Sequence, residues 1–525
     1  MSLSNDLPAY WDSSLHLAAF SLSGPIIVFL LWVLVSYGRV LYLRSRMPPG
    51  PFPYPIVGNI GRVPAAKPYL IFEKWSKEYD SPLITIWTGN RPTVVVNDCW
   101  AASDLMDKRA QIYSSRPHSY LADAFDETEN NQTSLVYGDK WRLHRRITHT
   151  VVGSQAVRGY RTFQANESKI LIRDIMETQQ FVSAIERYAC SVAAIIGWGR
   201  RVRSMDDDLA KLALSFVQTG AGLSAPAQYL VEAYPWMSKL PKRIYPFPSM
   251  IWDEGQKLLQ YFYALTVEGA KLEQDSFSKR LIQDQDKDNN LSPKEIASLT
   301  GNLIGGGVDT TTTTIIVFIF AMCAFPRVQQ KAQEEIDSVL AGEPPTWADE
   351  DSLPYCKALL TEIFRWRAAI ALGGPPHAPV HDDSYKGMFI PRGTSIIGNL
   401  WAIHRNPRDY PYPDEPNPSK KGIFTFGWGR RLCSGQPLAE QGIWFTIVGL
   451  LWSFRMRSTD EHGNSKELGI FAFNDSPAPR PLPFTVEFKP RTSTTKDIIQ
   501  AAALKAEDEL RKYDVSSKVA IENFQ

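Results

Sequence analysis

The sequence predicts a mainly α-helical protein with a smaller β region (α+β), preceded by one membrane-spanning helix. Three observations predict this class. Residues 292–325 form one long helical segment that ends at Pro326, and residues 151–290 are mostly helical in pattern. Two short runs rich in β-branched residues, 82–89 and 92–96, indicate strands. The few strand signals imply that the β region is small.

The composition is that of a globular protein with a large core. The chain has 525 residues, a net charge of +1, 44% hydrophobic residues and 22% charged residues. This neutrality offers no electrostatic footprint for a nucleic acid, so we expect no nucleic-acid partner. The five cysteines are scattered, odd in number and without a C-x-x-C spacing, which argues against a disulfide framework or a zinc site.

The N-terminal stretch at residues 15–43 is almost uncharged. About 20 apolar residues suffice to span a bilayer, so this stretch is a predicted transmembrane anchor. Arg44 and Arg46 follow it, which places residues 1–14 in the lumen and the body in the cytosol. A cleaved signal peptide would carry its positive residues first. A buried core helix is disfavoured because a stiff Pro-rich hinge, residues 44–58, comes next.

The long helical segment contains an unusual centre. Ser292 and Glu295 form a capping-box pattern, and the segment continues for roughly 50 Å. Three consecutive glycines at 305–307 cost a helix interior about 3 kcal/mol relative to alanine. A close helix crossing would explain the glycines but not the adjacent Asp309 and Thr310. A groove at the glycines, with Thr310 bonded back to the carbonyl of residue 306 or to water, would explain both features.

The most informative motif is F-x-x-G-x-R-x-C-x-G, formed by Phe426, Gly429, Arg431, Cys433 and Gly435. Each position has a purpose if Cys433 is the thiolate ligand of a haem iron. The glycines let the backbone approach the porphyrin and aim N–H groups at sulfur, the phenyl ring covers the sulfur, and the arginine reaches a propionate. A Gly-rich loop with one buried thiol is the alternative, which five constrained positions within ten residues disfavour.

This motif resembles the cysteine loop of the cytochrome P-450 superfamily, the haem-thiolate monooxygenases. The resemblance runs from about residue 48 to 491. The sequence of the cysteine loop is most similar to filamentous-fungal members of specialised metabolism. It implies the cytochrome P-450 fold for residues 59–491 and haem b with Cys433 as its axial ligand. It also implies insertion of one oxygen atom from O2 into a lipophilic small molecule, by hydroxylation or epoxidation.

The resemblance assigns further site residues. Asp309 and Thr310 match the oxygen-activation signature and would deliver protons. Trp141 and Arg145 stand i,i+4 on one helical face and match the pair that holds a propionate, although a solvated basic face has the same pattern. His377 matches a propionate contact, and a neutral core histidine is its rival interpretation.

An E-x-x-R pair, Glu362 and Arg365, matches the buried structural pair beneath the haem. Alone, such a pair is usually surface decoration. The chain departs from the family just before the cysteine loop, where residues 416–421 are shortened and Lys420 stands in place of an arginine that joins this pair. Lysine lacks the planar fork of arginine. One alternative is a haem-binding member that this altered segment disables. Another is a member of the same fold that rearranges or couples substrates, against which the intact Asp309–Thr310 pair argues.

The resemblance also implies partners and a location. Electrons from NADPH would arrive through a separate flavoprotein reductase, with cytochrome b5 as an additional candidate donor. The protein would be a single-pass protein of the endoplasmic reticulum membrane. Expected pocket walls are residues 112–137, 215–250, 306–310, 369–377 and 471–475.

Two further segments have open interpretations. Residues 234–252, rich in Pro, aromatic and basic residues, suit either an interfacial loop or a loop packed on the body. The charged tail, residues 492–525, suggests a solvated helix or partial disorder.

Overall fold

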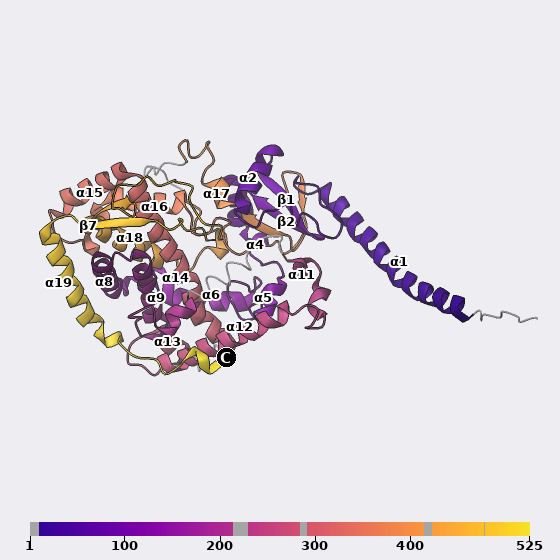
Figure 1. Cartoon of the computed structure of the whole chain (residues 1–525), viewed down its shortest axis with the longest axis horizontal. Helices are drawn as coiled ribbons and strands as arrows, with labels where there is room; N and C mark the ends of the chain where they lie inside the picture. The colour runs from indigo at the N-terminus through magenta and orange to yellow at the C-terminus, as the bar shows by residue number, and fades with distance from the viewer. Residues whose placement is uncertain (1–9, 214–228, 284–290, 414–422, 477, 525) are drawn as a thin grey trace, which may run out of the picture.

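The computed structural model describes residues 10–213, 229–283, 291–413, 423–476 and 478–524. These residues form a mostly helical body with small sheets, and helix α1 (Tyr10–Arg44) leads away from it (Figure 1). The predicted mainly α class with a smaller β region is confirmed.

The long predicted helix is the centre of the body. Helix α14 (Pro293–Ala324) begins with both hydrogen bonds of a capping box between Ser292 and Glu295, and Pro326 opens the next helix. Its C-terminal half is buried in the main hydrophobic core. The helices packed on it are α9 (Phe181–Trp198), α12 (Phe247–Gly269), α15 (Pro326–Leu340), α16 (Pro354–Trp366) and α18 (Gln436–Ser453).

Shorter helices complete the body and carry its loops. They are α2 (Pro68–Glu78), α3 (Cys99–Ala102), the π-helix η1 (Ser103–Lys108), α4 (Ala110–Tyr113), α5 (Tyr120–Ala124), α6 (Asp139–Val152), α7 (Ser154–Arg158), α8 (Arg161–Thr178), α11 (Leu230–Ala233), η2 (Pro235–Lys239), α13 (Phe277–Gln283), η4 (Trp347–Ser352), α17 (Leu400–Ile403), η5 (Gly429–Arg431), η6 (Arg511–Tyr513) and η7 (Ile521–Phe524). The stretch 99–108 is α3 followed by a π-helix, and the stretch 110–137 contains α4 and α5.

The two predicted strands are present as an antiparallel pair. Strand β1 (Leu83–Thr88) pairs with β2 (Arg91–Val96), and β5 (Ser395–Gly398) adds to β2 in parallel. Residues 373–379 form only isolated bridges, at His377 and Ala378. The remaining pairs are β3 (Asp383–Tyr385) with β4 (Met388–Ile390), and β6 (Phe454–Thr459) with β7 (Thr485–Pro490).

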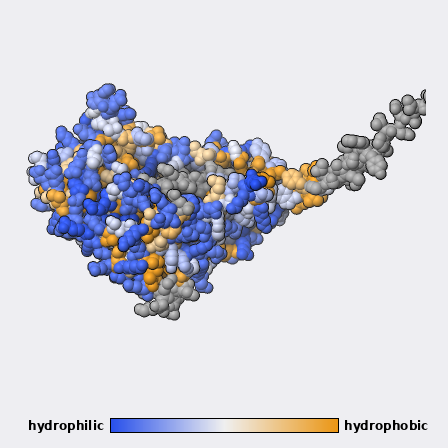
Figure 2. Space-filling model, turned by 60° about the horizontal axis from the view of Figure 1, so that its bottom comes forward, coloured by the Kyte–Doolittle hydropathy of each residue, from blue (hydrophilic) through white to orange (hydrophobic). Residues whose placement is uncertain are grey.

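Helix α1 is the one long apolar helix that the body leaves uncovered. Three of the described helices are long and apolar enough to cross a membrane. Those at Phe181–Trp198 and Pro293–Ala324 are mostly buried in the body, whereas the span Ile26–Arg44 is only 6% buried. Figure 2 shows hydrophobic residues gathered where α1 leaves the body. A lipid bilayer would cover these side chains.

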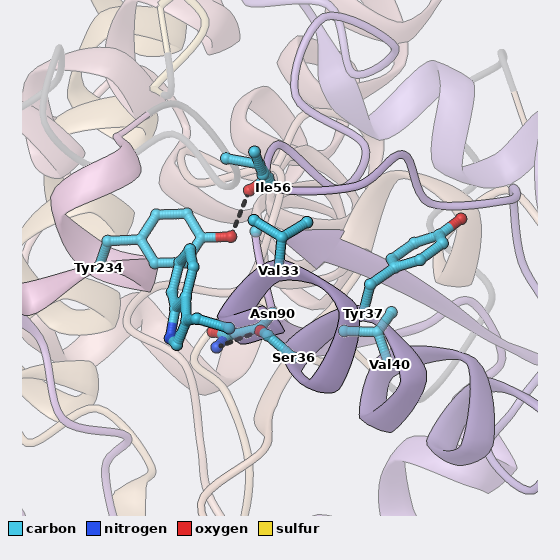
Figure 3. A pocket seen from close by; sticks show the side chains of 9 residues that line it. Val33, Ser36, Tyr37, Val40, Ile56, Asn90 and Tyr234 are labelled. Atoms are coloured by element: carbon cyan, nitrogen blue, oxygen red, sulfur yellow. Dashed lines mark hydrogen bonds between the residues drawn. The ribbon is translucent and has the colours of Figure 1, made fainter. Parts of the chain in front are cut away.

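The inner end of α1 is docked on the body (Figure 3). The Trp32 ring lies 5.5 Å from the Tyr234 ring, between centroids, and Tyr234 donates its hydroxyl proton to the Ile56 carbonyl at 2.5 Å. Asn90 Nδ2 donates to Ser36 Oγ at 3.4 Å. These contacts join α1, the β1–β2 turn and α11, so they set the direction in which α1 leaves the body.

The C-terminal segment differs from its sequence-based expectation. Helix α19 (Ser493–Leu510) packs along α8 and buries Ile499, Ala503, Ala506 and Leu510. Phe524 then reaches the Tyr261 ring of α12, with 6.2 Å between the ring centroids. The segment is helical as suggested, but one of its faces is part of the core because apolar residues recur on that face.

Candidate functional site

A cavity of about 1230 Å³ lies between α14 and the loop that carries Cys433. Residues 369–377 and parts of 112–137 line it, as predicted. The wall expected at 471–475 is corrected, because Phe471 is exposed and the lining runs instead from Asp475 to Ser476 and Ala478. Residues 215–228 of a further expected wall lie outside the described residues.

The cysteine loop is held in a tight, glycine-dependent shape. Gly429 has φ +53°, and a Cβ added to it would lie 2.1 Å from the carbonyl oxygen of Met106. Only glycine fits such a position. The Cys433 N–H donates to the Phe426 carbonyl at 2.8 Å, and the Phe426 ring packs on the Phe364 ring with 5.0 Å between centroids.

Cys433 is the cysteine whose thiol is exposed, while the other four are buried. Because Cys433 lines the cavity, its accessible surface faces that space. Burial raises the pKa of the Cys433 thiol, and the backbone N–H of Gly435, the Arg145 guanidinium and the backbone N–H of Gln436 act in the opposite direction. A shielded sulfur surrounded by such donors suits a thiolate whose proton a metal ion displaces.

Three guanidinium groups meet at the same cavity. Arg116, Arg145 and Arg431 all line it, and none of them forms an ion pair with a carboxylate of the described residues. Arg431 donates to the carbonyls of Ser114 at 2.7 Å and Leu135 at 2.6 Å. Burial, with repulsion from Arg116 and Arg145, lowers the pKa of Arg431 to about 8. Three clustered guanidinium groups without carboxylate partners fit the two propionates of a haem. Arg145 and Arg431 were predicted from the sequence, whereas Arg116 was missed.

Trp141 and His377 also lie at this cluster. The Arg431 guanidinium lies 4.6 Å from the centroid of the buried Trp141 ring, and Arg145 donates to Ser434 Oγ at 2.7 Å. His377 Nδ1 lies 2.9 Å from the Tyr113 carbonyl, and burial lowers the pKa of His377 to about 3. A neutral ring that donates from Nδ1 keeps a lone pair on Nε2, so it has no donor left for a propionate. This geometry favours the interpretation of His377 as a neutral core histidine.

The predicted Glu362–Arg365 pair is buried and bidentate. Its nitrogen–oxygen distances are 2.7 and 2.5 Å, and both side chains are 3% exposed, so the surface alternative is wrong. Arg365 also donates to the His404 carbonyl at 2.7 Å, and His404 Nε2 accepts from the Phe424 N–H at 2.9 Å. This chain of bonds joins α16 to the cysteine loop. Lys420 lies outside the described residues.

The glycines of α14 leave free space at the cavity. A Cβ added to Gly306 or Gly307 would meet no atom within 4 Å. Thr310 Oγ1 donates to the Gly306 carbonyl at 2.8 Å, the contact that the sequence suggests. The helix nevertheless stays α-helical through the glycines. The space at the cavity therefore comes from the missing side chains of the glycines, within a regular helix.

Asp309 has a partner that sequence reasoning missed. Arg480 donates from Nη2 to Asp309 at 2.6 Å, from Nη1 to Glu186 at 2.9 Å and from Nε to the Thr313 hydroxyl at 3.1 Å. Asp309 is therefore one end of a largely buried carboxylate–guanidinium–carboxylate row. No local motif marks Arg480, because it follows Asp309 by 171 residues.

Comparison with known proteins agrees with this geometry. The family model described as Cytochrome P450 matches residues 48–478. Cytochrome P450 monooxygenase virE of Hypocrea virens is 29% identical over 516 residues, which cover 92% of this chain and 91% of the relative. Cytochrome P450 monooxygenase 58 of Postia placenta is 32% identical over 489 residues, or 87% and 92% of the two chains. Cytochrome P450 monooxygenase aneD of Aspergillus aculeatus is 29% identical over 484 residues, or 89% and 92%.

Proposed function

Because the chain belongs to the cytochrome P450 family of monooxygenases, we propose that it inserts one oxygen atom from O2 into a lipophilic small molecule, by hydroxylation or epoxidation. The observation that carries this proposal is the Cys433 thiol, which is exposed to a large cavity that Gly306 and Thr310 also line. Thiolate ligation favours cleavage of the O–O bond when a haem is bound.

The residues of the chain have distinct tasks in this proposal. Cys433 would ligate the haem iron, and Arg116, Arg145 and Arg431 would neutralise the propionates. Trp141 packs on this cluster. Gly306 and Gly307 keep space free at the opposite wall, and Thr310 holds a hydroxyl there that can exchange its bond to the Gly306 carbonyl for one to a ligand or water. Asp309, held by Arg480, connects that hydroxyl with a route for protons.

The setting follows from the same features. We propose a single-pass anchor in the endoplasmic reticulum membrane through α1, with the body in the cytosol, since the span Ile26–Arg44 is apolar and uncovered, ends at Arg44 and is followed by Arg46. NADPH-derived electrons would come from a flavoprotein reductase, with cytochrome b5 as a second candidate. A role in fungal secondary-metabolite biosynthesis is proposed from the fungal origin of the similar monooxygenases.

A reduced, carbon-monoxide difference spectrum of the full-length protein in microsomes tests this function. The expected result is a strongly red-shifted Soret band that is lost in C433A and kept in C323A, which removes a buried thiol elsewhere. Incorporation of labelled oxygen from O2, with NADPH and reductase, then tests the reaction. The absence of the band from folded protein would contradict the proposal and favour a disabled member. A band without oxygen incorporation would favour rearrangement or coupling.

A further inference from the structure

One acidic residue in the cavity wall has no counter-charge. Glu127 follows α5 and lines the cavity. Asn131 Nδ2 donates to its Oε1 at 3.2 Å, and Ser134 Oγ donates to its Oε2 at 3.1 Å. No lysine, arginine or histidine of the described residues forms an ion pair with it. Both oxygens are thus oriented by neutral donors, and each keeps a lone pair for a further donor.

Three other carboxylates of the body show the contrast, because each is paired with a cation. Glu362 pairs with Arg365, and Asp309 pairs with Arg480. Even the preceding residue, Asp126, contacts Lys294 Nζ and accepts from Gln256 at 3.0 Å. An uncompensated carboxylate away from water is costly unless a partner arrives. Glu127 therefore differs from these three carboxylates, because no cation pairs with it.

The electrostatics and a second unsatisfied group point in the same direction. Burial raises the pKa of the Glu127 carboxyl, Ser134 and Asn131 oppose that rise, and no cation contributes. The residue still has accessible surface, as expected of a group that faces a cavity. Beside it, the buried hydroxyl of Thr128 also lines the cavity and has no hydrogen-bond partner among the described residues. A carboxylate without a cation and a hydroxyl without a partner thus lie next to each other in the cavity wall.

We propose that Glu127 recognises a cationic amine on the lipophilic substrate. An amine hydrogen can bond to a free lone pair of the carboxylate while its charge compensates the acid. The apolar body of the same molecule would lie along Leu258, Leu259 and Phe262 of α12, which line the same cavity. The inference rests on the proposed function and deepens it by naming the substrate class, a nitrogenous lipophilic molecule.

Binding of two matched probes to the full-length holoprotein tests this inference. The probes are N,N-dimethyl-2-(1-naphthyl)ethylamine and its neutral carbon isostere, 1-(3-methylbutyl)naphthalene, measured by equilibrium dialysis at pH 7. In the wild-type protein we expect the amine to bind about tenfold tighter than the isostere, because it alone can pair with a buried carboxylate. Equal binding of the two probes would overturn the inference without any variant.

The substitutions E127Q and E129Q separate this pairing from other causes. Glu129 is an exposed acid two residues along the same loop, so E129Q is a matched control. We expect E127Q to remove the preference for the amine and to leave the isostere's affinity within about twofold, whereas E129Q changes neither. A preference that survives in E127Q, for example through coordination of the iron by the amine, would overturn the inference. Binding needs no turnover, and each variant's carbon-monoxide spectrum reports separately on the proposed function.

Discussion

At the residue scale, the most consequential contact is the one between Asp309 and Arg480. A carboxylate at the cavity wall can pass protons only while its bonding partners exchange. Arg480 donates to Asp309, Glu186 and the Thr313 hydroxyl with three different nitrogens. The guanidinium therefore orients Asp309 and connects it with a second carboxylate. We expect this row to hold Asp309 in place during proton delivery.

The substitution R480Q should separate proton delivery from cofactor binding. We expect the rate of product formation to fall about tenfold or more, since a positioned proton donor contributes at least that much. The carbon-monoxide spectrum should not change, because Arg480 does not contact the cysteine loop among the described residues. The measurement is the ratio of product formed to NADPH consumed.

A matched control for this prediction is R457Q. Arg457 pairs with Glu487 at 2.8 Å on the surface, where both side chains are about half exposed. This variant should retain the wild-type ratio of product to NADPH. If R480Q also keeps the wild-type ratio of product to NADPH, Asp309 does not need Arg480 for proton delivery.

At the element scale, α14 has firmly held ends and a central stretch of glycines that leaves space at the cavity. Its capping box and buried C-terminal half hold it in place, while Gly306 and Gly307 leave room at the cavity. Glycine in a helix interior is less favourable than alanine. The two glycines therefore lower helix stability at the place where the cavity needs space.

The substitution G306A tests this trade-off. An added Cβ meets no protein atom within 4 Å, so we expect the free energy of unfolding to rise by up to about 1 kcal/mol through helix propensity. We expect turnover with a bulky substrate to fall, because the methyl group occupies space at the cavity. Thermal unfolding and steady-state kinetics measure the two effects. A variant that is both more stable and fully active would disprove the role of the open centre.

Helix α19 offers a second test at this scale. Ala503 is fully buried against α8, whereas its neighbour Leu504 is 65% exposed. A503E would bury a charge without a partner, and we expect a loss of about 2–4 kcal/mol in the free energy of unfolding. L504E is the matched control and should change little. Similar melting temperatures for both variants would mean that α19 contributes nothing to the stability of the body.

Local signals explain which elements the sequence could predict. The capping box at Ser292, the proline at 326 and the β-branched runs act within a few residues, and α14, β1 and β2 follow them closely. The buried face of α19 was also present in the sequence, since Ile499, Ala503, Ala506 and Leu510 recur at helical spacing, but its many charged neighbours concealed it.

The site divides in the same way. Residues inside a motif, such as Cys433 and the Glu362–Arg365 pair, could be predicted because their spacing is fixed. Arg116 and Arg480 could not, since neither belongs to a motif: Arg116 lines the cavity, and Arg480 binds Asp309 from 171 residues away. The pairing of His377 with the Tyr113 carbonyl likewise depends on a contact across 264 residues. Charge partners of this kind emerge only from tertiary packing.

At the scale of the whole molecule, α1 and an apolar patch lie on the same side of the body. The patch consists of Trp236, Ile244, Met250 and Trp252, which are all exposed. Tyr234, at the start of η2, contacts Trp32 of α1 and so joins the two. An exposed apolar patch beside a membrane anchor suits an interfacial loop. Of the two interpretations of residues 234–252, the interfacial loop is therefore favoured over a loop packed on the body.

Removal of residues 1–45 tests how the protein binds a membrane. We expect the shortened chain to float with liposomes less completely than the full chain, because the patch alone remains. Adding W236E and I244E should abolish the remaining association. V339E, at an exposed apolar residue of α15, is the control and should leave the remaining association unchanged. Complete loss of binding on removal of residues 1–45 alone would assign all of the affinity to α1.

The three guanidinium groups at the cavity make the amount of folded protein in the cell depend on the supply of haem. Arg116, Arg145 and Arg431 carry like charges close together, and burial together with repulsion from Arg116 and Arg145 lowers the pKa of Arg431. If a haem supplies the missing anions, it binds the native chain and not the unfolded one, so it shifts the folding equilibrium by mass action. Cells starved of haem would then accumulate less of this protein through degradation, with no change in its transcription.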